Sequence, residues 1–288
     1  MVNITGDAQL IALLGSPIAH SISPLIHNES FQQLGLNYIY KAFETTAEQM
    51  ATTVEHLRKA NARGFNVTMP GKNIIASLCD QLSPVSEICG SVNTVVNENG
   101  TLIGHTTDGV GYFRALQEDG YHMTNNKMTL LGTGGAATSI FVQAALDGMA
   151  EISIFNRPGK SFDHAKAIIG QLRNRTSCKI NLYDINDVAK LKQEICESSL
   201  LTNATSVGMA PNTEHSLIED STFLHKNLLV SDIIYNPRET RLLKLAREAG
   251  CQTSNGLYML LYQGAEAFKL WTGKEMPIEL IKEKYFSE

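Results

Sequence analysis

Cysteine is sparse in this chain, and no two cysteines form a close pair. The five cysteines are scattered, odd in number and never spaced as Cys-x-x-Cys. Such a set argues against a disulfide framework and against a thiolate zinc site, and it favours a reducing compartment. We therefore expect a cytoplasmic protein with no metal site.

Long apolar runs and clusters of basic charge are also missing. Residues 1–9 carry Asp7 and no basic segment, and the apolar run Leu10–Leu14 is too short for a signal sequence or a membrane span. The net charge is −5 without a long basic run, whereas nucleic-acid binding needs clustered Lys and Arg to neutralise phosphates. We expect neither a membrane nor a nucleic acid as a partner.

What is present fits a globular protein of two domains. The chain of 288 residues is too long for a single ordinary hydrophobic core. Its composition, 43% hydrophobic and 18% charged, is that of a globular protein rather than a disordered one. From Asp108 onward, strand and helix patterns alternate, as in a doubly wound parallel sheet. We predict an α/β fold with an N-terminal α/β substrate domain (residues 1–106) and a doubly wound Rossmann domain (residues 107–252). The helical residues 253–288 are expected to pack back on the first domain.

Hydrophobic periodicity and turn residues predict the individual elements. Strands are expected at residues 10–14, 38–43, 64–68, 91–97, 101–105, 127–131, 152–155, 180–183, 200–203 and 228–234. Helices are expected at 23–34, 47–60, 74–79, 109–118, 136–147, 162–172 and 188–196, and over most of 256–285. Ser23 is expected to cap its helix with Pro24 in the first turn, and Asn99-Gly100 to form a hairpin turn.

A glycine-rich turn follows the predicted strand 127–131. Gly132-x-Gly134-x-x-Ala137 matches the G-x-G-x-x-[G/A] pattern, in which the glycines allow a tight turn and a close approach of pyrophosphate. The N–H groups of the following helix would face the phosphates. The alternative is a structural glycine turn in an unrelated α/β domain. The residues predicted to bind a dinucleotide here are Gly132, Thr133, Gly134, Gly135 and Ala136.

Two later strand ends extend this cofactor prediction. An NAD site usually has Asp or Glu after the second strand, but this chain has Asn156 and Arg157. Arg157 and Lys160 are suited to a 2′-phosphate, although Lys160 alone also fits an ordinary surface lysine. Small polar residues follow the strand at 200–203, where ligands of open sheets bind, unless this is a simple loop. The further predicted cofactor residues are Asn156, Thr205, Ser206, Val207 and Met209.

A lysine and an aspartate are candidates for acid–base chemistry. Lys72 follows a Pro-Gly loop, and Asp108 ends a polar run where the second domain begins. A catalytic acid or base for alcohol–ketone chemistry must hydrogen-bond the reacting oxygen, and a neighbouring carboxylate would orient a lysine for this task. Each residue singly also fits a surface charge, and the sequence does not show that the two meet.

Ordered motifs along nearly the whole chain resemble those of shikimate dehydrogenases, especially the branch that also accepts quinate. They are Gly15-Ser16-Pro17, Ser21-Ile22-Ser23-Pro24, Asn66–Lys72, Ser91-Val92-Asn93-Thr94, Thr107-Asp108-Gly109, Gly132–Ala136, Asn156-Arg157, Asn203–Met209, Tyr235-Asn236-Pro237, Gly256 and Gln263-Gly264-Ala265. The resemblance implies reversible reduction of 3-dehydroshikimate to shikimate, with hydride moving between nicotinamide C4 and substrate C3. Quinate is an open second substrate.

The resemblance also implies a role for each site residue. Lys72 would be the acid or base, paired with Asp108. Ser21 and Ser23 would bind the substrate carboxylate. Ring hydroxyls would meet Thr68, Asn93, Asp108 and Gln263, with Tyr235 as a further substrate contact and with Ile234 and Gly256 beside the nicotinamide. Each of four residues also has a purely structural interpretation. Ser23 could cap a helix, Asn93 could serve a turn, Gln263 could lie on the surface and Tyr235 could lie in the core.

The segment Asn156–Phe162 departs from the pattern of NADP-dependent members, which show Asn-Arg-Thr and a further arginine. An acid that the quinate-accepting branch often has is also absent at Gly159. The longer loop and Phe162 resemble the NAD-using branch, so we expect NAD or NADP with a preference for NAD.

We expect a monomer or a homodimer. The alternatives are a non-catalytic dinucleotide-binding regulatory module, or a related dehydrogenase of another small polar substrate such as a folate-carbon compound. The paired Ser21 and Ser23 suit a small carboxylate better than a pterin.

Overall fold

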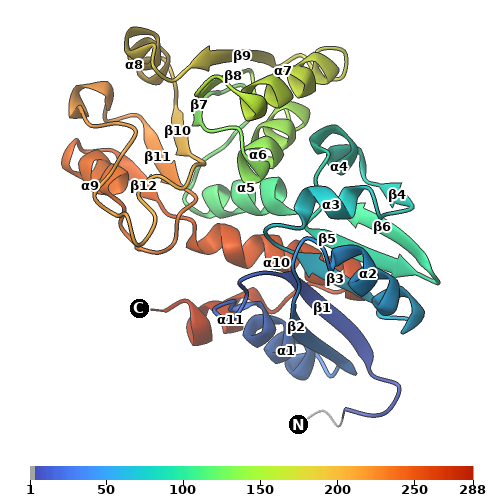
Figure 1. The fold of residues 1–288 in the computed structure, drawn as a ribbon. Coiled ribbons are helices and arrows are strands. Elements are labelled where there is room, and N and C mark those ends of the chain that lie inside the picture. Colours follow the sequence, from blue (N-terminus) through green and yellow to red (C-terminus); the bar gives the residue numbers. More distant parts are fainter. Residues whose placement is uncertain (1–3, 288) are drawn as a thin grey trace. The chain divides into compact units, whose positions relative to one another are not determined.

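The computed structural model describes residues 4–287 (Figure 1), and the chain divides into two compact units. Unit 1 extends to Thr107 and resumes at Gln263, and unit 2 is Asp108–Tyr262. Unit 2 therefore ends at Tyr262, ten residues later than the expected end of the Rossmann domain at residue 252. The reason is a short strand, β12 (Gln252–Ser254), which pairs in parallel with β11 (Leu229–Asp232) of unit 2.

Unit 1 contains a mixed sheet of strand order β2-β1-β3-β5-β6-β4. Three parallel strands form one side, namely β1 (Gln9–Gly15), β2 (Tyr38–Glu44) and β3 (Gly64–Val67). The antiparallel hairpin of β5 (Thr94–Glu98) and β6 (Thr101–His105) continues the sheet, and β4 (Gln81–Leu82) pairs with β6. Asn99 and Gly100 have φ values of 53° and 94°, which confirms the expected hairpin turn.

Helices cover both faces of this sheet. They are α1 (Ser23–Gln33), α2 (Met50–Lys59), α3 (Lys72–Ala76), α4 (Pro84–Cys89), α11 (Ile278–Tyr285) and the second part of α10 (Leu257–Thr272). On one face, Met50 of α2 and Ile75 of α3 pack with Phe65 in a buried cluster. On the other, the Trp271 indole of α10 donates to the Val95 carbonyl at 2.9 Å. Both faces of the central strands are therefore buried.

Two local expectations in unit 1 need correction. Ser23 does not cap α1: the N-cap position is Ile22, and the Ser21 hydroxyl accepts the Ser23 N–H at 3.3 Å. Helix α3 begins at Lys72 rather than at residue 74, which places the candidate lysine on the first helical turn. Helix α4 was not anticipated, although Ser83 caps it and a proline follows.

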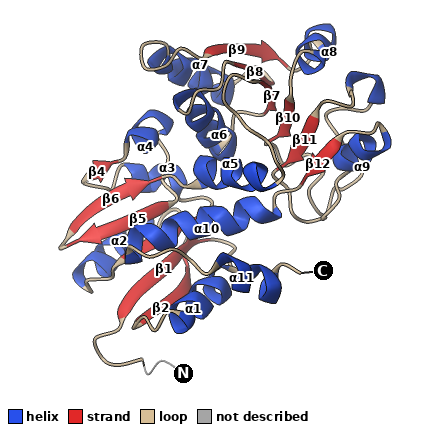
Figure 2. Ribbon diagram, turned by 180° about the vertical axis from the view of Figure 1, so that it is seen from behind, coloured by secondary structure: helices blue, strands red, loops and turns tan. Residues whose placement is uncertain are grey.

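Unit 2 contains a parallel sheet of strand order β12-β11-β10-β7-β8-β9 (Figure 2). The remaining strands are β7 (Lys127–Leu131), β8 (Glu151–Asn156), β9 (Lys179–Asp184) and β10 (Leu200–Asn203). This confirms the doubly wound Rossmann fold. The direction of winding reverses between β7 and β10, so the carboxyl ends of these strands form the switch point at which such sheets bind ligands.

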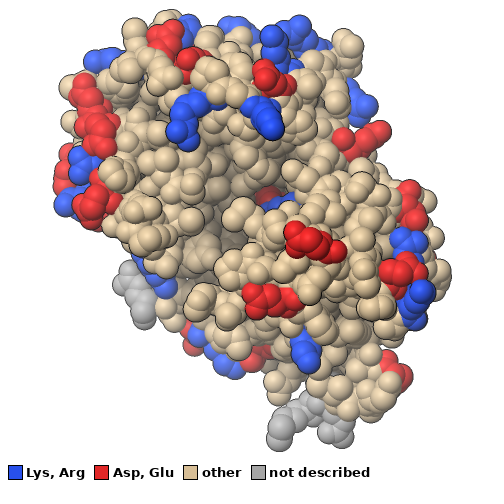
Figure 3. All heavy atoms as spheres, viewed as in Figure 1, with Lys and Arg blue, Asp and Glu red and all other residues tan. Residues whose placement is uncertain are grey.

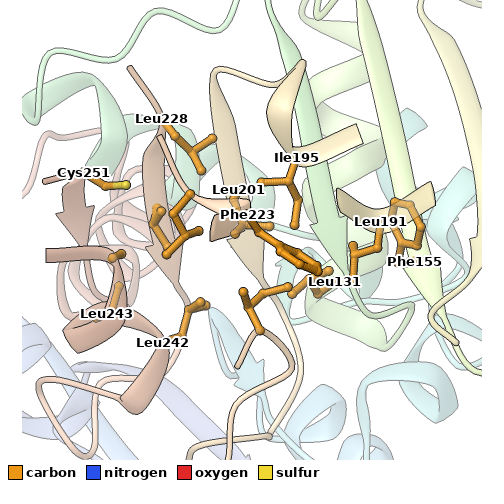
Figure 4. Close-up of a cluster of buried hydrophobic side chains, with 14 residues drawn as sticks. Leu131, Phe155, Leu191, Ile195, Leu201, Phe223, Leu228, Leu242, Leu243 and Cys251 are labelled. Carbon is orange, nitrogen blue, oxygen red and sulfur yellow. The ribbon is translucent and has the colours of Figure 1, made fainter. Parts of the chain in front are cut away.

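Helices pack on both faces of the unit 2 sheet. They are α5 (Asp108–Glu118), α6 (Gly135–Leu146), α7 (Lys160–Leu172), α8 (Val188–Cys196) and α9 (Arg241–Glu248), with a 3-10 turn at Ser221–Phe223. Figure 4 shows Ile195 of α8 and Leu242 of α9 in one apolar cluster with Leu201 of β10. Helix α5 lies on the other face, where its Tyr112 hydroxyl pairs with Thr202 at 2.6 Å. Helix α9 and strand β12 were not anticipated from the sequence.

A cluster of charges joins the amino ends of the strands in unit 2. The Glu194 carboxylate of α8, 3% exposed, lies 2.7 Å from both Lys127 and Lys190, and it accepts from the Ser153 hydroxyl at 2.6 Å. Burial raises the Glu194 pKa, but the hydrogen bonds from these three residues outweigh burial and leave it at about 2. The carboxylate therefore stays ionised and holds the edge of the sheet opposite the switch point.

Candidate active site

The loop after β3 sets the position of Lys72. The Thr68 N–H donates to the Leu14 carbonyl, and the Gly71 N–H to the Thr68 carbonyl, both at 2.9 Å. A side chain at Gly71 would come within 2.4 Å of Met50 Cε, so glycine lets the loop pack against α2. Lys72 then opens α3 with its side chain half-buried.

Buried polar side chains of unit 1 form a chain of hydrogen bonds. The Tyr40 hydroxyl donates to Asn66 Oδ1 at 2.8 Å, and Asn66 Nδ2 donates to the Thr94 hydroxyl at 3.0 Å and to the Asn93 carbonyl at 3.1 Å. Burial raises the Tyr40 pKa, and a hydrogen bond with Ser23 partly offsets this. The structure thus links the predicted residues Ser23 and Asn93 through Tyr40 and Asn66. The sequence analysis gave no site role to Tyr40 or Asn66, although Asn66 begins one of the motifs; the available signal was polarity inside buried strands.

Asn93 connects several predicted residues of unit 1. Its Oδ1 accepts the Thr107 N–H at 2.9 Å, and its Nδ2 donates to the Thr107 hydroxyl at 3.0 Å and to Gln263 Oε1 at 3.4 Å. The neighbouring Val92 N–H donates to the Lys72 carbonyl at 2.9 Å. Gln263 is therefore half-buried and paired rather than a plain surface residue.

The two candidate catalytic residues belong to different units. Lys72 lies in unit 1, whereas Asp108 is the first residue of unit 2 and of α5, with 5% of its surface exposed. Their convergence on one atom stays a prediction. Tyr235, which follows β11 in unit 2, is 50% exposed, so it is not a core residue.

The glycine-rich turn of unit 2 has the geometry of a phosphate cradle. Gly132 has a φ of 108°, and a Cβ there would lie 2.8 Å from Thr205 Cγ2. Gly134 and Gly135 are exposed at the start of α6, which has no side-chain cap, and a Cβ at Gly134 would meet nothing within 4 Å in the described chain. The Thr133 hydroxyl is buried and has no hydrogen-bond partner among residues 4–287. The N–H groups of the first turn of α6 and this hydroxyl fit a pyrophosphate here.

The loop after β10 is ordered by its own side chains. The Thr205 hydroxyl donates to Asn203 Oδ1 at 2.7 Å and accepts the Val207 N–H at 3.1 Å. Ser206 and Met209 of this loop are exposed. The predicted residues of this segment therefore form a defined turn at the carboxyl end of β10, next to Gly132.

Ile234 and Gly256 are brought together beyond β11. The Gly256 N–H donates to the Ile234 carbonyl at 3.0 Å. A Cβ at Gly256 would lie 1.9 Å from the Ile233 carbonyl oxygen, so only glycine allows this approach.

The end of β8 carries a cationic loop. Asn156 Nδ2 donates to the Arg157 carbonyl at 3.0 Å and to the Ser161 hydroxyl at 3.1 Å. Arg157 and Lys160 are both exposed around Gly159, which has a φ of 146°. An amide thus occupies the strand end at which an NAD site would usually place a carboxylate.

Surface charges and metal-ligating residues were compared within the described chain. Figure 3 shows Lys and Arg interspersed with Asp and Glu over the drawn face. Within residues 4–287, no group of three or more His, Cys, Asp or Glu side chains is arranged to hold a metal ion. No helix in the same range has the length and apolar content to cross a membrane.

Comparison with known proteins gives consistent results. Residues 13–95 match the family model for the shikimate dehydrogenase substrate binding domain, and residues 256–284 match the shikimate 5'-dehydrogenase C-terminal domain. A curated shikimate dehydrogenase (NADP(+)) of Listeria monocytogenes is 50% identical over 98% of this chain and 97% of its own length. The sequence-based preference for NAD is therefore not supported by this relative.

Solved structures agree with the sequence relatives. A shikimate 5-dehydrogenase from Listeria monocytogenes, in complex with shikimate and NAD, is 51% identical with a TM-score of 0.93, covering 97% of both chains. A quinate dehydrogenase from Corynebacterium glutamicum, in complex with NAD, is 26% identical with a TM-score of 0.86, covering 98% of this chain and 99% of that one.

Proposed function

We infer the reaction from one premise: this chain belongs to the shikimate dehydrogenase family. It catalyses the reversible, nicotinamide-dependent reduction of 3-dehydroshikimate to shikimate. The observation that carries this conclusion is 50% identity to a curated member over 98% of the chain. It is joined by the glycine turn Gly132–Ala136, in which the buried Thr133 hydroxyl has no hydrogen-bond partner among residues 4–287.

Lys72 acts as the acid or base at the reacting oxygen, and Asp108 orients it. Unit 1 supports this pairing through its own contacts. The Lys72 carbonyl is bonded to Val92, and the adjacent Asn93 holds Thr107 by two hydrogen bonds. Asp108 directly follows Thr107 in the chain, so the backbone that leads into it is fixed by the same contacts.

The substrate binds to the polar side chains of unit 1. Ser21 and Ser23 receive its carboxylate, and the ring hydroxyls meet Thr68, Asn93 and Gln263. Tyr235, exposed after β11, supplies a further contact. A hydroxylated cyclohexene acid needs many paired donors and acceptors, because buried groups left unpaired are costly. The connected amides and hydroxyls of unit 1 supply such groups.

The nicotinamide cofactor supplies or accepts the hydride when it is bound. Gly134 and Gly135 receive its pyrophosphate on their N–H groups, and the Thr133 hydroxyl, without a partner in the described chain, adds a donor. NADP is the preferred form, since Arg157 and Lys160 carry positive charge where β8 ends without a carboxylate. The loop Thr205–Met209, Ile234 and Gly256 border the nicotinamide side.

Quinate is a second, weaker substrate in this proposal, supported by the likeness to a quinate dehydrogenase. Cytoplasmic location is supported by the cysteines of residues 4–287, all of which are free thiols. Monomer and homodimer are both compatible with this activity.

Steady-state kinetics with shikimate and quinate, each against NADP and NAD, test the proposal through nicotinamide absorbance. We expect the highest kcat/KM for shikimate with NADP. No turnover with any of the four combinations would instead favour a dinucleotide-binding module without catalysis. Turnover with quinate alone would reverse the substrate assignment.

A further inference from the structure

A buried carboxylate at the end of β11 has no place in the roles assigned so far. Asp232 is the last residue of that strand, and its side chain is 0% exposed. It lies at the carboxyl edge of the sheet, where the loops assigned to the cofactor begin.

Its hydrogen-bond donors come from separate segments. Asp232 Oδ1 accepts from Asn203 Nδ2 and from the Ile234 N–H, both at 3.1 Å, and Oδ2 accepts from the Thr240 hydroxyl at 2.8 Å. All of these donors are neutral. One carboxylate therefore joins the end of β10, the loop after β11 and the start of α9.

The bond to Asn203 sets the direction of the Asn203 amide. With Nδ2 committed to Asp232 and to the Val207 carbonyl at 3.2 Å, Oδ1 faces the Thr205 N–H at 3.1 Å and the Thr205 hydroxyl at 2.7 Å. The conformation of the Thr205–Val207 turn thus depends on an acceptor at Asp232.

The bonds to Ile234 and Thr240 act on the second loop. The Ile234 carbonyl receives the Gly256 N–H, while Thr240 caps α9 with its hydroxyl and donates the hydroxyl proton to Asp232. A backbone bond from Ala210 to Asn236, at 3.2 Å, also links the two loops. Loss of the carboxylate would therefore shift the loops rather than detach them.

We propose that Asp232 is a positioning residue for the cofactor. By holding the Asn203–Met209 loop, Ile234 and Thr240 together, it fixes the backbone that borders the nicotinamide. This inference rests on the proposed function, because it needs those loops to receive a dinucleotide. A carboxylate suits the task since charge-assisted hydrogen bonds are stronger and more directional than neutral ones.

The first test uses Asp232→Asn, which keeps the shape and one acceptor oxygen. Dissociation constants for NADP and NAD come from quenching of intrinsic fluorescence, and KM and kcat from turnover. We expect the cofactor dissociation constant and KM to rise about tenfold, while kcat at saturating cofactor changes less than threefold. Unchanged cofactor binding in Asp232→Asn would overturn the proposal.

Matched variants separate positioning from general loosening. Thr240→Val should weaken cofactor binding in the same direction, and Thr240→Ser, which keeps the hydroxyl, should restore it. Glu194→Gln alters another buried carboxylate of unit 2, at the opposite edge of the sheet. It should lower thermal stability and leave cofactor affinity unchanged, and an equal loss of affinity in Glu194→Gln would also refute a specific role for Asp232.

The two proposals can fail separately. If the unaltered chain binds NADP but turns over none of the substrates, the proposed reaction fails while the binding comparison still decides the role of Asp232. If turnover is normal and Asp232→Asn behaves like the unaltered chain, only the positioning role fails.

Discussion

Asn93 and Thr107 are joined by two hydrogen bonds that use both ends of the Asn93 amide. Oδ1 accepts the Thr107 N–H at 2.9 Å, and Nδ2 donates to the Thr107 hydroxyl at 3.0 Å. Both side chains are buried. The pair holds the last residue of unit 1 before the candidate catalytic aspartate.

Thr107→Val should impair substrate binding. Valine keeps the shape but removes the acceptor for Asn93 Nδ2, so the amide that meets a ring hydroxyl loses part of its orientation. We expect the KM for shikimate to rise about tenfold, which matches one hydrogen bond of about 1.4 kcal/mol. NADP affinity should stay unchanged. Thr107→Ser retains the hydroxyl and serves as control; equal KM values for the two variants would contradict the role of this bond.

Lys72→Ala should remove most of the chemical step. Acid–base groups typically contribute about 10²–10⁴-fold to turnover, so kcat should fall by that factor while the circular dichroism spectrum stays unchanged. Lys59→Ala is the matched control, because Lys59 is an exposed lysine of the same unit whose ion pair is with Glu55. Near-normal kcat in the Lys72 variant would remove it from the mechanism.

Arg157→Ala should shift cofactor selectivity. Loss of a guanidinium beside a 2′-phosphate should raise the KM for NADP about tenfold and leave that for NAD within about twofold. Arg173→Ala, at the opposite end of α7, controls for the change in net charge. If both cofactors weakened equally in Arg157→Ala, the arginine would not discriminate between them.

Glu194→Gln should destabilise unit 2 at neutral pH. The Glu194 pKa is lowered from 4.5 to about 2, so its ionised form favours the folded state by about 3 kcal/mol above pH 5. This stability is present above the unfolded pKa and is lost as the pH falls toward 2. Urea unfolding at pH 7 and pH 3 measures it, and the difference between variant and unaltered chain should shrink at the lower pH. Glu197, which is half-exposed, also pairs with Lys127, and Glu197→Gln should destabilise the unit less than Glu194→Gln because solvent screens an exposed ion pair.

Asp232→Asn should have the opposite effect on stability. Burial raises the Asp232 pKa from 3.8 to about 6, against the partly offsetting hydrogen bonds from Thr240, Ile234 and Asn203. The folded state therefore holds this proton more tightly than the unfolded chain, and stability is lost as the pH rises from about 4 through 6. At pH 7.5 we expect the free energy of unfolding of the Asp232→Asn variant to be up to about 3 kcal/mol higher than that of the unaltered chain. A loss of stability in this variant would mean that the carboxylate serves the fold itself.

The same titration should appear in cofactor binding. Below about pH 6 the protonated Asp232 loses acceptor capacity, so the dissociation constant should rise in the unaltered chain and stay flat in Asp232→Asn. NAD is the suitable probe, because it lacks a 2′-phosphate that titrates. Tyr112 of α5 also interacts electrostatically with Asp232, but burial raises the Tyr112 pKa, so the tyrosine stays neutral over this pH range. A pH profile identical in both chains would contradict this prediction.

Much of the fold followed from local pattern. The alternation after Asp108 predicted the parallel sheet, and the turn at Gly132 was recognised because a strand precedes it and a helix follows it. Strand β12 was missed because its three residues carry little periodic signal. Helix α9 was missed although Thr240 caps it and its buried residues Leu242, Leu243 and Ala246 recur at helical spacing. Asp232 was missed for another reason: a carboxylate at a strand end is usually solvated, and only packing shows that this one is not.

The sequence by itself determined the order of elements, the glycine turns and the residue types available to a polar substrate and a dinucleotide, because these depend on neighbours a few positions apart. Only the tertiary structure decided which polar groups pair. Tyr40 meets Asn66 across 26 positions, and Asn203 meets Asp232 across 29. Such bonds depend on strand register and on the loss of solvent around each group, and both arise only when distant segments pack together.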